Sequence, residues 1–253
     1  MRTLYAIGIG AGDPAHLTVQ AIDRLNRVDV FFVLDKGSEK ADLVRLRQEI
    51  LDRFVTRPHR LVLVADPPRD RTPEDYRAAV ADWHAARAAV YERVLLSELP
   101  DGSTGAFLVW GDPSLYDSTI ALIEAVLARG NVEFEYEVIP GISSISALVA
   151  RHRTTMNQIG RPVQLTTGRR LATGWPEGVD DVLVLLDAHT SFDSYADTGL
   201  QIYWGAYVGT PDEILISGPL TSALAAEIRE TRAAARERHG WIMDTYLLRR
   251  PAG

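Results

Sequence analysis

Two Gly-Asp-Pro turns follow directly after runs of apolar, strand-forming residues, and they constrain the fold more than any other feature. Leu4–Ile9 runs into the glycine-rich turn Gly8–Pro14, and Phe107–Trp110 runs into Gly111–Pro113. Proline restricts the Asp before it to extended conformations, so each turn ends its strand sharply. Further apolar runs alternate with stretches of helical periodicity. This alternation predicts an α/β fold, in which ligands bind outside the carboxyl ends of the strands.

We expect strands over the apolar runs and helices over the periodic stretches between them. The predicted strands are 4–9, 30–34, 61–64, 107–110, 136–139, 163–166, 182–186, 202–207, 214–217 and 241–248. The predicted helices are one entered through Asp13-Pro14, one from Thr72 to Leu96, and two over 118–128 and 222–238. A boundary near residue 117 would give an N-terminal α/β domain, 1–116, and a C-terminal α/β domain, 117–253.

Composition narrows the class of protein. The 253 residues include 27 basic and 34 acidic side chains, and this net charge of −7 argues against a general polyanion binder. Cys is absent, which excludes disulfides and thiolate nucleophiles, and the six His show no ligand spacing, so we expect no metal. No apolar run approaches the ~20 residues of a membrane span, and Met1–Gly10 lacks a signal-peptide layout. We expect a cytoplasmic enzyme.

One stretch departs from the acidic average. Residues 151–170 carry five arginines and His152, and no acidic residue. The planar guanidinium suits bidentate contacts with carboxylate or phosphate groups, although a solvated basic face is the alternative interpretation. The candidate anion-binding residues are Arg151, Arg153, Arg161, Arg169 and Arg170.

Two common interpretations of the glycine turns fail on spacing. Gly8–Gly12 would start a dinucleotide-binding fingerprint, but the third glycine falls on Asp13, whose charge would oppose a pyrophosphate. Gly141-Ile142-Ser143 would start the nucleophile elbow of a serine hydrolase, but position 145 is Ile rather than Gly. We therefore interpret Ser143 or Ser144 as a helix N-cap whose hydroxyl also meets a ligand.

Four segments recur in this order in the tetrapyrrole methyltransferases, the S-adenosylmethionine-dependent enzymes of cobalamin and sirohaem synthesis. They are Gly8–Pro14, Gly111–Tyr116, Ile139–Ser144 and Gly209–Leu220, and the resemblance covers essentially the whole chain. It implies a parallel N-terminal sheet, a mixed C-terminal sheet and a cofactor cleft between the two domains. The tetrapyrrole side of the cleft would be 1–116 and the S-adenosylmethionine side 117–253. The resemblance also implies a homodimer.

By match to the family pattern, cofactor contacts fall on turns at the ends of strands. The implied residues are Gly10, Ala11, Gly111, Asp112, Leu115, Tyr116, Ser143, Ser144, Asp187, Ala188, Tyr207 and Val208. Two positions depart from the pattern, because Ala11 stands where Pro is usual and Asp187 where Met is common. Main-chain contacts would tolerate both changes.

Further segments, at 110–119, 166–171, 202–207 and 240–250, resemble one member in particular. This resemblance implies methylation of precorrin-5 at C1 with loss of the acetyl group as acetate, giving precorrin-6A. An electron-rich ring carbon can attack a sulfonium methyl in line, so positioning would supply most of the catalysis. Precorrin carboxylates would match the arginines of 151–170. Acetate release needs a directed water, for which Asp112, Tyr116 and His152 are the acid–base candidates.

Two other classes of function stay open. An enzyme of the same family could act on another precorrin, on RNA or on a protein, but an RNA enzyme is expected to carry a broader basic surface. A non-enzymatic nucleotide-binding module would bind the cofactor without methyl transfer, and would leave the arginines unexplained. We expect an anionic tetrapyrrole as partner, and neither nucleic acid nor a membrane.

Overall fold

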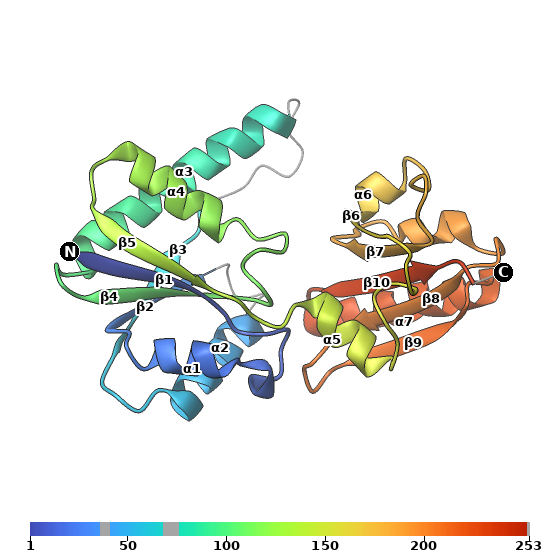
Figure 1. The fold of residues 1–253 in the computed structure, drawn as a ribbon, viewed down its shortest axis with the longest axis horizontal. Helices are drawn as coiled ribbons and strands as arrows, with labels where there is room; N and C mark the ends of the chain where they lie inside the picture. The colour runs from blue at the N-terminus through green and yellow to red at the C-terminus, as the bar shows by residue number, and fades with distance from the viewer. Residues whose placement is uncertain (36–40, 68–75, 252–253) are drawn as a thin grey trace. The chain divides into compact units, whose positions relative to one another are not determined.

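The chain divides into two compact units in a computed structural model that describes residues 1–35, 41–67 and 76–251 (Figure 1). Unit 1 consists of Met1–Gly10 and Pro14–Ile142, and unit 2 of Ala11–Asp13 and Ser143–Gly253. The division thus falls after Ile142 rather than near residue 117, because the strand Phe134–Ile139 pairs with the N-terminal strand of the chain. The predicted α/β class is confirmed.

Unit 1 is built on a parallel sheet in the order β3-β2-β4-β1-β5. The strands are β1 (Arg2–Gly8), β2 (Val30–Asp35), β3 (Arg60–Ala65), β4 (Thr104–Val109) and β5 (Phe134–Ile139). Side chains alternate along β1, so that Leu4 faces one apolar core with Tyr91 and Tyr5 faces another with Phe31. Burial of both faces explains why these strands are near-continuous apolar runs.

Helices cover both faces of this sheet (Figure 1). They are α1 (Val19–Leu25), α2 (Ala41–Phe54), α3 (Tyr76–Glu98) and α4 (Thr119–Arg129). The prediction of a helix entered through Asp13-Pro14 is wrong, because Pro14–His16 forms only a 3-10 turn. The helix begins at Val19, where the Thr18 hydroxyl caps it by accepting from the Ala21 amide at 3.0 Å. The expected start of α3 at Thr72 lies outside the described residues.

Unit 2 carries a mixed sheet in the order β6-β7-β10-β8-β9, as the resemblance implies. Only β6 and β7 pair in parallel. The strands are β6 (Val163–Thr167), β7 (Asp181–Leu185), β8 (Gln201–Ala206), β9 (Ile214–Pro219) and β10 (Asp244–Arg249), and the helices α5 (Ser144–Arg151), α6 (Gly168–Leu171) and α7 (Ser222–His239). The last strand begins three residues later than predicted.

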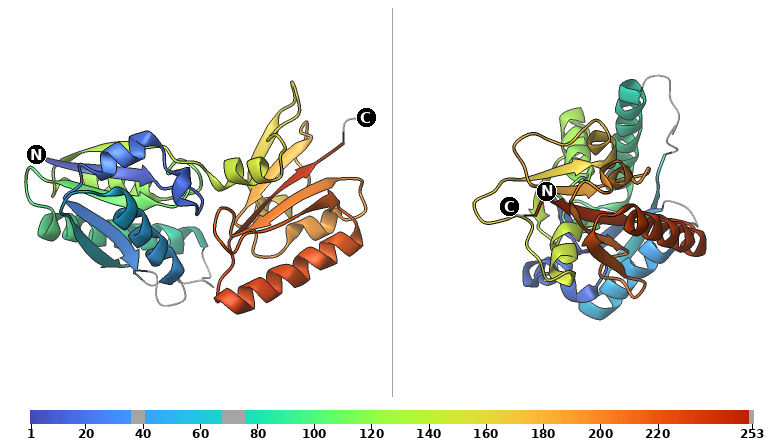
Figure 2. Two further views of the ribbon diagram at one scale, coloured as in Figure 1. Left: turned by 90° about the horizontal axis from the view of Figure 1, so that it is seen from below. Right: turned by 90° about the vertical axis from the view of Figure 1, so that its right-hand side faces the viewer.

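The core of unit 2 lies between its sheet and α7, which runs along one face of the sheet (Figure 2). Trp204 of β8 and Tyr246 of β10 are fully buried there beside Ile228 of α7. On the opposite face Gly205 lies against Leu148 of α5, and a Cβ at Gly205 would be 2.7 Å from the Leu148 side chain. In the described part of the chain, no helix is long and apolar enough to cross a membrane.

Candidate functional site

Three of the predicted turns meet at the carboxyl ends of β1, β4 and β5 in unit 1. Gly10 and Gly111 form an antiparallel bridge with N–O distances of 3.3 and 2.8 Å. Gly141 packs against both neighbouring turns, so that a Cβ on Gly8 would lie 2.6 Å from the Gly141 nitrogen and 2.9 Å from the Gly111 oxygen. Only glycine permits this approach of three backbones. The structure therefore brings together motifs that are far apart in the sequence, such as those of Gly8 and Gly141.

The Asp112 carboxylate ties two of these turns together. One oxygen accepts from the Gly141 amide at 2.9 Å, and the other accepts from the Ser114 amide at 2.8 Å and from the Ser114 hydroxyl. Burial raises the pKa of Asp112, but the hydrogen bonds outweigh it and leave the pKa below its usual value. The group is therefore a carboxylate at neutral pH, and both of its oxygens are already occupied. This is the environment of a structural acceptor rather than of a general acid.

For Asp112→Asn we expect the free energy of unfolding to fall by about 1–2 kcal/mol at pH 7, because an NH2 group replaces an acceptor. The lowered pKa means that the wild-type carboxylate stabilises the fold above its unfolded pKa, near 3.8, and loses this effect as the pH falls through the folded value. Urea titrations should thus show the difference between wild type and variant narrowing below about pH 4. The exposed Asp23→Asn is the control. A difference that stays constant down to pH 2 would contradict this role.

Leu115 and Tyr116 follow on the same loop. Tyr116 has a φ of 49°, in the left-handed region that a tyrosine rarely adopts, and its side chain is 48 % exposed. Its hydroxyl has no hydrogen-bond partner among the described residues. Such strain persists where the surrounding structure holds it, and it is concentrated at functional sites. The ligand contact expected at Tyr116 stays a prediction, and the exposed side chain is accessible for it.

In unit 2, Ala11–Asp13 lies against the turn that follows β8. A Cβ on Gly12 would be 2.6 Å from the Thr210 methyl and 3.2 Å from the Val208 oxygen. The structure thus brings Gly12, the residue after the predicted cofactor position Ala11, next to Val208. Glu213 holds this turn, since one of its oxygens accepts from the Gly209 amide at 2.8 Å.

Tyr207 stands at the same turn and is also held in the left-handed region, at a φ of 49°. Its hydroxyl donates to the Trp241 carbonyl at 2.6 Å. Burial raises the pKa of Tyr207 to about 12, so the hydroxyl keeps its proton. The ring thus anchors the turn, and leaves the main chain of Tyr207 and Val208 for any ligand contact.

Asp187 lies just after β7 and turns its side chain into unit 2. Its carboxylate accepts from the Ser191 amide at 2.6 Å, the His189 amide at 3.0 Å and the Tyr246 hydroxyl at 2.6 Å. Burial, together with the Asp187 carboxylate, raises the pKa of Tyr246 far above its usual value, so that hydroxyl donates. Gly168 packs directly on the carboxylate and leaves no room for a Cβ. Any ligand contact at 187–188 is therefore left to the main chain and to Ala188.

Ser143 is the N-cap of α5, as predicted for this position or the next, and its hydroxyl accepts from the Ser146 amide at 3.1 Å. Ser144 is the first residue of the helix. His152 is the C-cap of the same helix, and its Nε2 donates to the Trp204 carbonyl at 3.0 Å. Burial lowers the pKa of His152, so the ring is neutral at pH 7. The His152 side chain thus links the end of α5 to β8 through this hydrogen bond.

The arginines of 151–170 do not form one set of unpaired cations. Arg151 pairs with Glu213 at 2.5 Å, and Arg161 lies 3.6 Å from Asp180. Arg153 follows α5 in the left-handed region, and Arg169 and Arg170 lie on α6, where Arg170 lines a small pocket with Thr166 and Trp175. The acids that pair with this stretch come from distant parts of the sequence. Arg151 in effect supports the turn that Glu213 holds.

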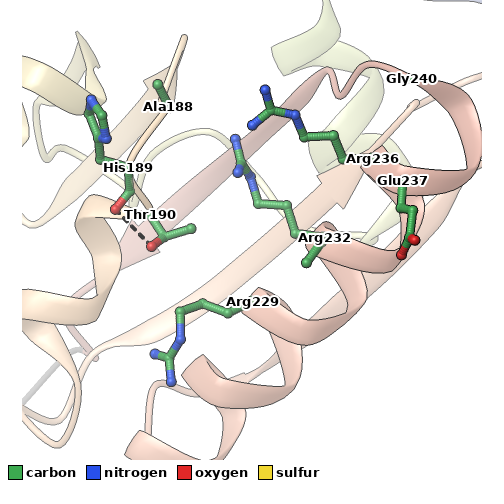
Figure 3. Close-up of a pocket in the computed structure, with 9 residues that line it drawn as sticks. Ala188, His189, Thr190, Arg229, Arg232, Arg236, Glu237 and Gly240 are labelled. Carbon is green, nitrogen blue, oxygen red and sulfur yellow. Dashed lines mark hydrogen bonds between the residues drawn. The ribbon is translucent and has the colours of Figure 1, made fainter.

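A set of arginines on α7 was not among the predicted site residues. Arg229, Arg232 and Arg236 line a pocket of about 610 Å³ together with Ala188, His189 and Thr190 (Figure 3). Their spacing of three and four residues places them on one face of the helix, and this signal is visible in the sequence. The predicted cofactor position Ala188 is thus part of the lining of this pocket.

The strand-end turns of unit 1 and those of unit 2, each taken by itself, offer groups of the kind that S-adenosylmethionine requires. Main-chain groups and glycines dominate both, and three buried ring nitrogens there lack a partner among the described residues. They are Nδ1 of His16 beside Gly10, Nε1 of Trp110, and Nε1 of Trp241 beside Tyr207. Buried polar atoms normally find partners, so these point to a ligand or ordered water. The adenine, ribose and amino-acid groups of the cofactor offer such donors and acceptors.

The fold and its strand-end motifs define a class of protein, and the family model for Tetrapyrrole (Corrin/Porphyrin) Methylases matches residues 3–224. The chain belongs to this family. Over its whole length it is 51 % identical to Precorrin-6A synthase [deacetylating] from Sinorhizobium sp, of which it covers 97 %. The resemblance drawn from the sequence is thus confirmed.

Solved structures agree with this assignment. A cobalamin synthesis related protein (CobF) from Corynebacterium diphtheriae is 38 % identical, with a TM-score of 0.85 over 98 % of both chains. Uroporphyrin-III C-methyl transferase from Thermus thermophilus, solved in complex with S-adenyl homocysteine, is 17 % identical, with a TM-score of 0.60 over 97 % of this chain and 96 % of that one. The latter shares the fold.

Proposed function

We propose that the chain is an S-adenosylmethionine-dependent C-methyltransferase of cobalamin biosynthesis. It methylates precorrin-5 at C1 and releases the acetyl group as acetate, giving precorrin-6A. The observation that carries this proposal is the 51 % identity, over the full length of the chain, to a precorrin-6A synthase. When bound, S-adenosylmethionine supplies a sulfonium methyl group for in-line attack by an electron-rich ring carbon.

The chain itself contributes positioning, since this reaction needs no protein nucleophile. We propose that the strand-end turns contact the cofactor chiefly through the main chain. In unit 1 these contacts come from Gly10, Gly111, Asp112, Leu115 and Tyr116. In unit 2 they come from Ala11, Ser143, Ser144, Asp187, Ala188, Tyr207 and Val208.

The acid–base role in acetate release stays a prediction, and the bonding of the three candidates narrows it. The Asp112 oxygens accept three hydrogen bonds, and the His152 Nε2 proton is donated to a carbonyl. The Tyr116 hydroxyl has no partner among the described residues and is exposed. Tyr116 is therefore the candidate best placed to direct a water at the acetyl carbonyl.

Methyl-labelled S-adenosylmethionine tests the class of substrate. In separate reactions it is offered with a mixture of precorrins, with total RNA and with total protein, and incorporated label is counted. We expect label only in the tetrapyrrole fraction. Label in RNA or protein would instead favour an enzyme of the same family that acts on RNA or on a protein. Binding of S-adenosylhomocysteine with no transfer to any fraction would favour a module that is not an enzyme.

We propose two further properties, the first from the resemblance and the second from the composition of the chain. The first is a homodimer, which sedimentation analysis tests directly. The second is a cytoplasmic location, and cell fractionation tests it.

A further inference from the structure

The pocket between α7 and the loop that follows β7 has one cationic wall. Arg229, Arg232 and Arg236 extend into it from consecutive turns of the helix (Figure 3). Three like charges on one helix face repel one another unless each meets an opposite charge. How each guanidinium is compensated therefore decides what the pocket can bind.

Two of the three arginines are compensated within unit 2. Arg232 is anchored, because its Nε donates to Asp244 at 2.9 Å and its Nη2 donates to the Asp187 main-chain oxygen at 2.9 Å. This pair is nearly buried, with 11 % of the Arg232 and 6 % of the Asp244 side chain exposed. Arg229 donates to Asp193 at 2.5 Å. Nη1 of Arg232 makes no hydrogen bond in the described structure, so its two N–H donors are available to a ligand in the pocket.

Arg236 has no ion pair or hydrogen bond from its side chain among the residues that the structure describes. Glu237 is the acidic residue in the lining, and it extends from the helix in another direction (Figure 3). Of the three arginines, Arg236 thus offers its donors and positive charge to a ligand without a carboxylate bound to it in the described structure.

The opposite wall is rigid. Ala188, His189 and Thr190 form it, and the buried Asp187 carboxylate holds this loop through the His189 and Ser191 amides. Thr190 is fixed in the left-handed region at a φ of 52°. Both walls are therefore built before a ligand arrives, which lowers the cost of binding.

We propose that this pocket binds a carboxylate side arm of the tetrapyrrole substrate, with Arg236 as the main contact and Arg232 as its fixed neighbour. The inference rests on the proposed function, because the precorrins carry acetate and propionate groups. It adds a contact on α7 to the substrate contacts expected among the arginines of 151–170, of which Arg151 and Arg161 face acids in the structure.

The test compares Arg236→Ala with Arg238→Ala by the KM for precorrin-5 and by calorimetric binding of S-adenosylhomocysteine. Both arginines are exposed in the last turn of α7, where each interacts favourably with the helix dipole, but only Arg236 lines the pocket. We expect Arg236→Ala to raise the KM about tenfold, as loss of a charge-assisted hydrogen bond does, and to leave cofactor binding unchanged. Arg238→Ala should change neither, and Arg236→Lys should recover part of the loss.

Several outcomes overturn the inference. An unchanged KM in Arg236→Ala, or an equal rise in Arg238→Ala, removes Arg236 as a substrate contact. Weaker binding of S-adenosylhomocysteine would assign the anion to the cofactor instead. In these cases wild-type methyl transfer persists and the proposed function stands. If the unchanged protein transfers no methyl group to any tetrapyrrole, the proposed function fails, and this inference fails with it.

Discussion

Gly141→Ala should lose about 3 kcal/mol or more of stability and should no longer bind S-adenosylhomocysteine. The new Cβ would collide with the Gly111 carbonyl and lie 2.9 Å from the Gly8 Cα, and both are backbone atoms with little freedom to move. The turns after β1, β4 and β5 would have to separate. Because those turns carry the five cofactor contacts proposed for unit 1, binding and stability should fall together.

Thermal unfolding and calorimetry measure the two effects. Gly130→Ala is the matched control, since Gly130 ends α4 with a φ of 70° and nothing within 4 Å of the new Cβ. Its cost should be only the left-handed penalty of about 1–2 kcal/mol, with cofactor binding intact. If Gly141→Ala is no less stable than this control and binds the cofactor normally, the close packing of the three turns does not matter to the site.

Asp187→Asn is the second change from which we expect a large effect. The amide would present an NH2 group to donors that now share one carboxylate, including the Ser191 amide and the Tyr246 hydroxyl. We expect a loss of about 3 kcal/mol in the free energy of unfolding, because buried donors would be left unpaired. The loop carrying Ala188 would also lose its fixed conformation, so binding of S-adenosylhomocysteine should weaken roughly tenfold.

A surface residue of the same kind supplies the control. Asp197 accepts from the amide and hydroxyl of Ser222, but it is exposed. Asp197→Asn should cost at most about 1 kcal/mol and leave cofactor binding unchanged. Tyr246→Phe removes a single donor to Asp187. If Asp187→Asn does not fold, this milder variant still tests whether the hydrogen bonds of Asp187 support cofactor binding. Normal cofactor binding in a folded Asp187 or Tyr246 variant would show that the hydrogen bonds of the Asp187 carboxylate are not needed for the cofactor site.

The strand-end turns were predictable from sequence because their determinants are local. A run such as Leu4–Ile9 followed by glycines and Asp-Pro specifies a strand and its end within a few residues. The mixed sheet of unit 2 and the position of Ser143 as a cap were likewise expected, the first from the resemblance. Helix α2 was not predicted, although Leu46, Ile50, Leu51 and Phe54 carry the helical spacing by which it packs on the sheet.

The predictions for the 151–170 arginines and for Asp187 lacked the partners of these side chains, which are distant in the sequence. The 151–170 stretch contains no acid, but Glu213 and Asp180 reach it from elsewhere in the fold and engage two of its arginines. Asp187 matched a cofactor position in the family, but its carboxylate meets Tyr246, 59 residues away, and turns inward. The charge and residue pattern of a short sequence segment cannot reveal hydrogen-bond or ion-pair partners that the tertiary fold brings from elsewhere in the chain.

The most direct test of the proposed function is a single-turnover reaction of precorrin-5 with methyl-labelled S-adenosylmethionine under anaerobic conditions. Mass spectrometry measures the labelled tetrapyrrole, and an enzymatic assay measures acetate in the same sample. We predict one labelled methyl group per product and one acetate released with it. A methylated product that retains its acetyl group, or no methylated tetrapyrrole at all, would contradict the account.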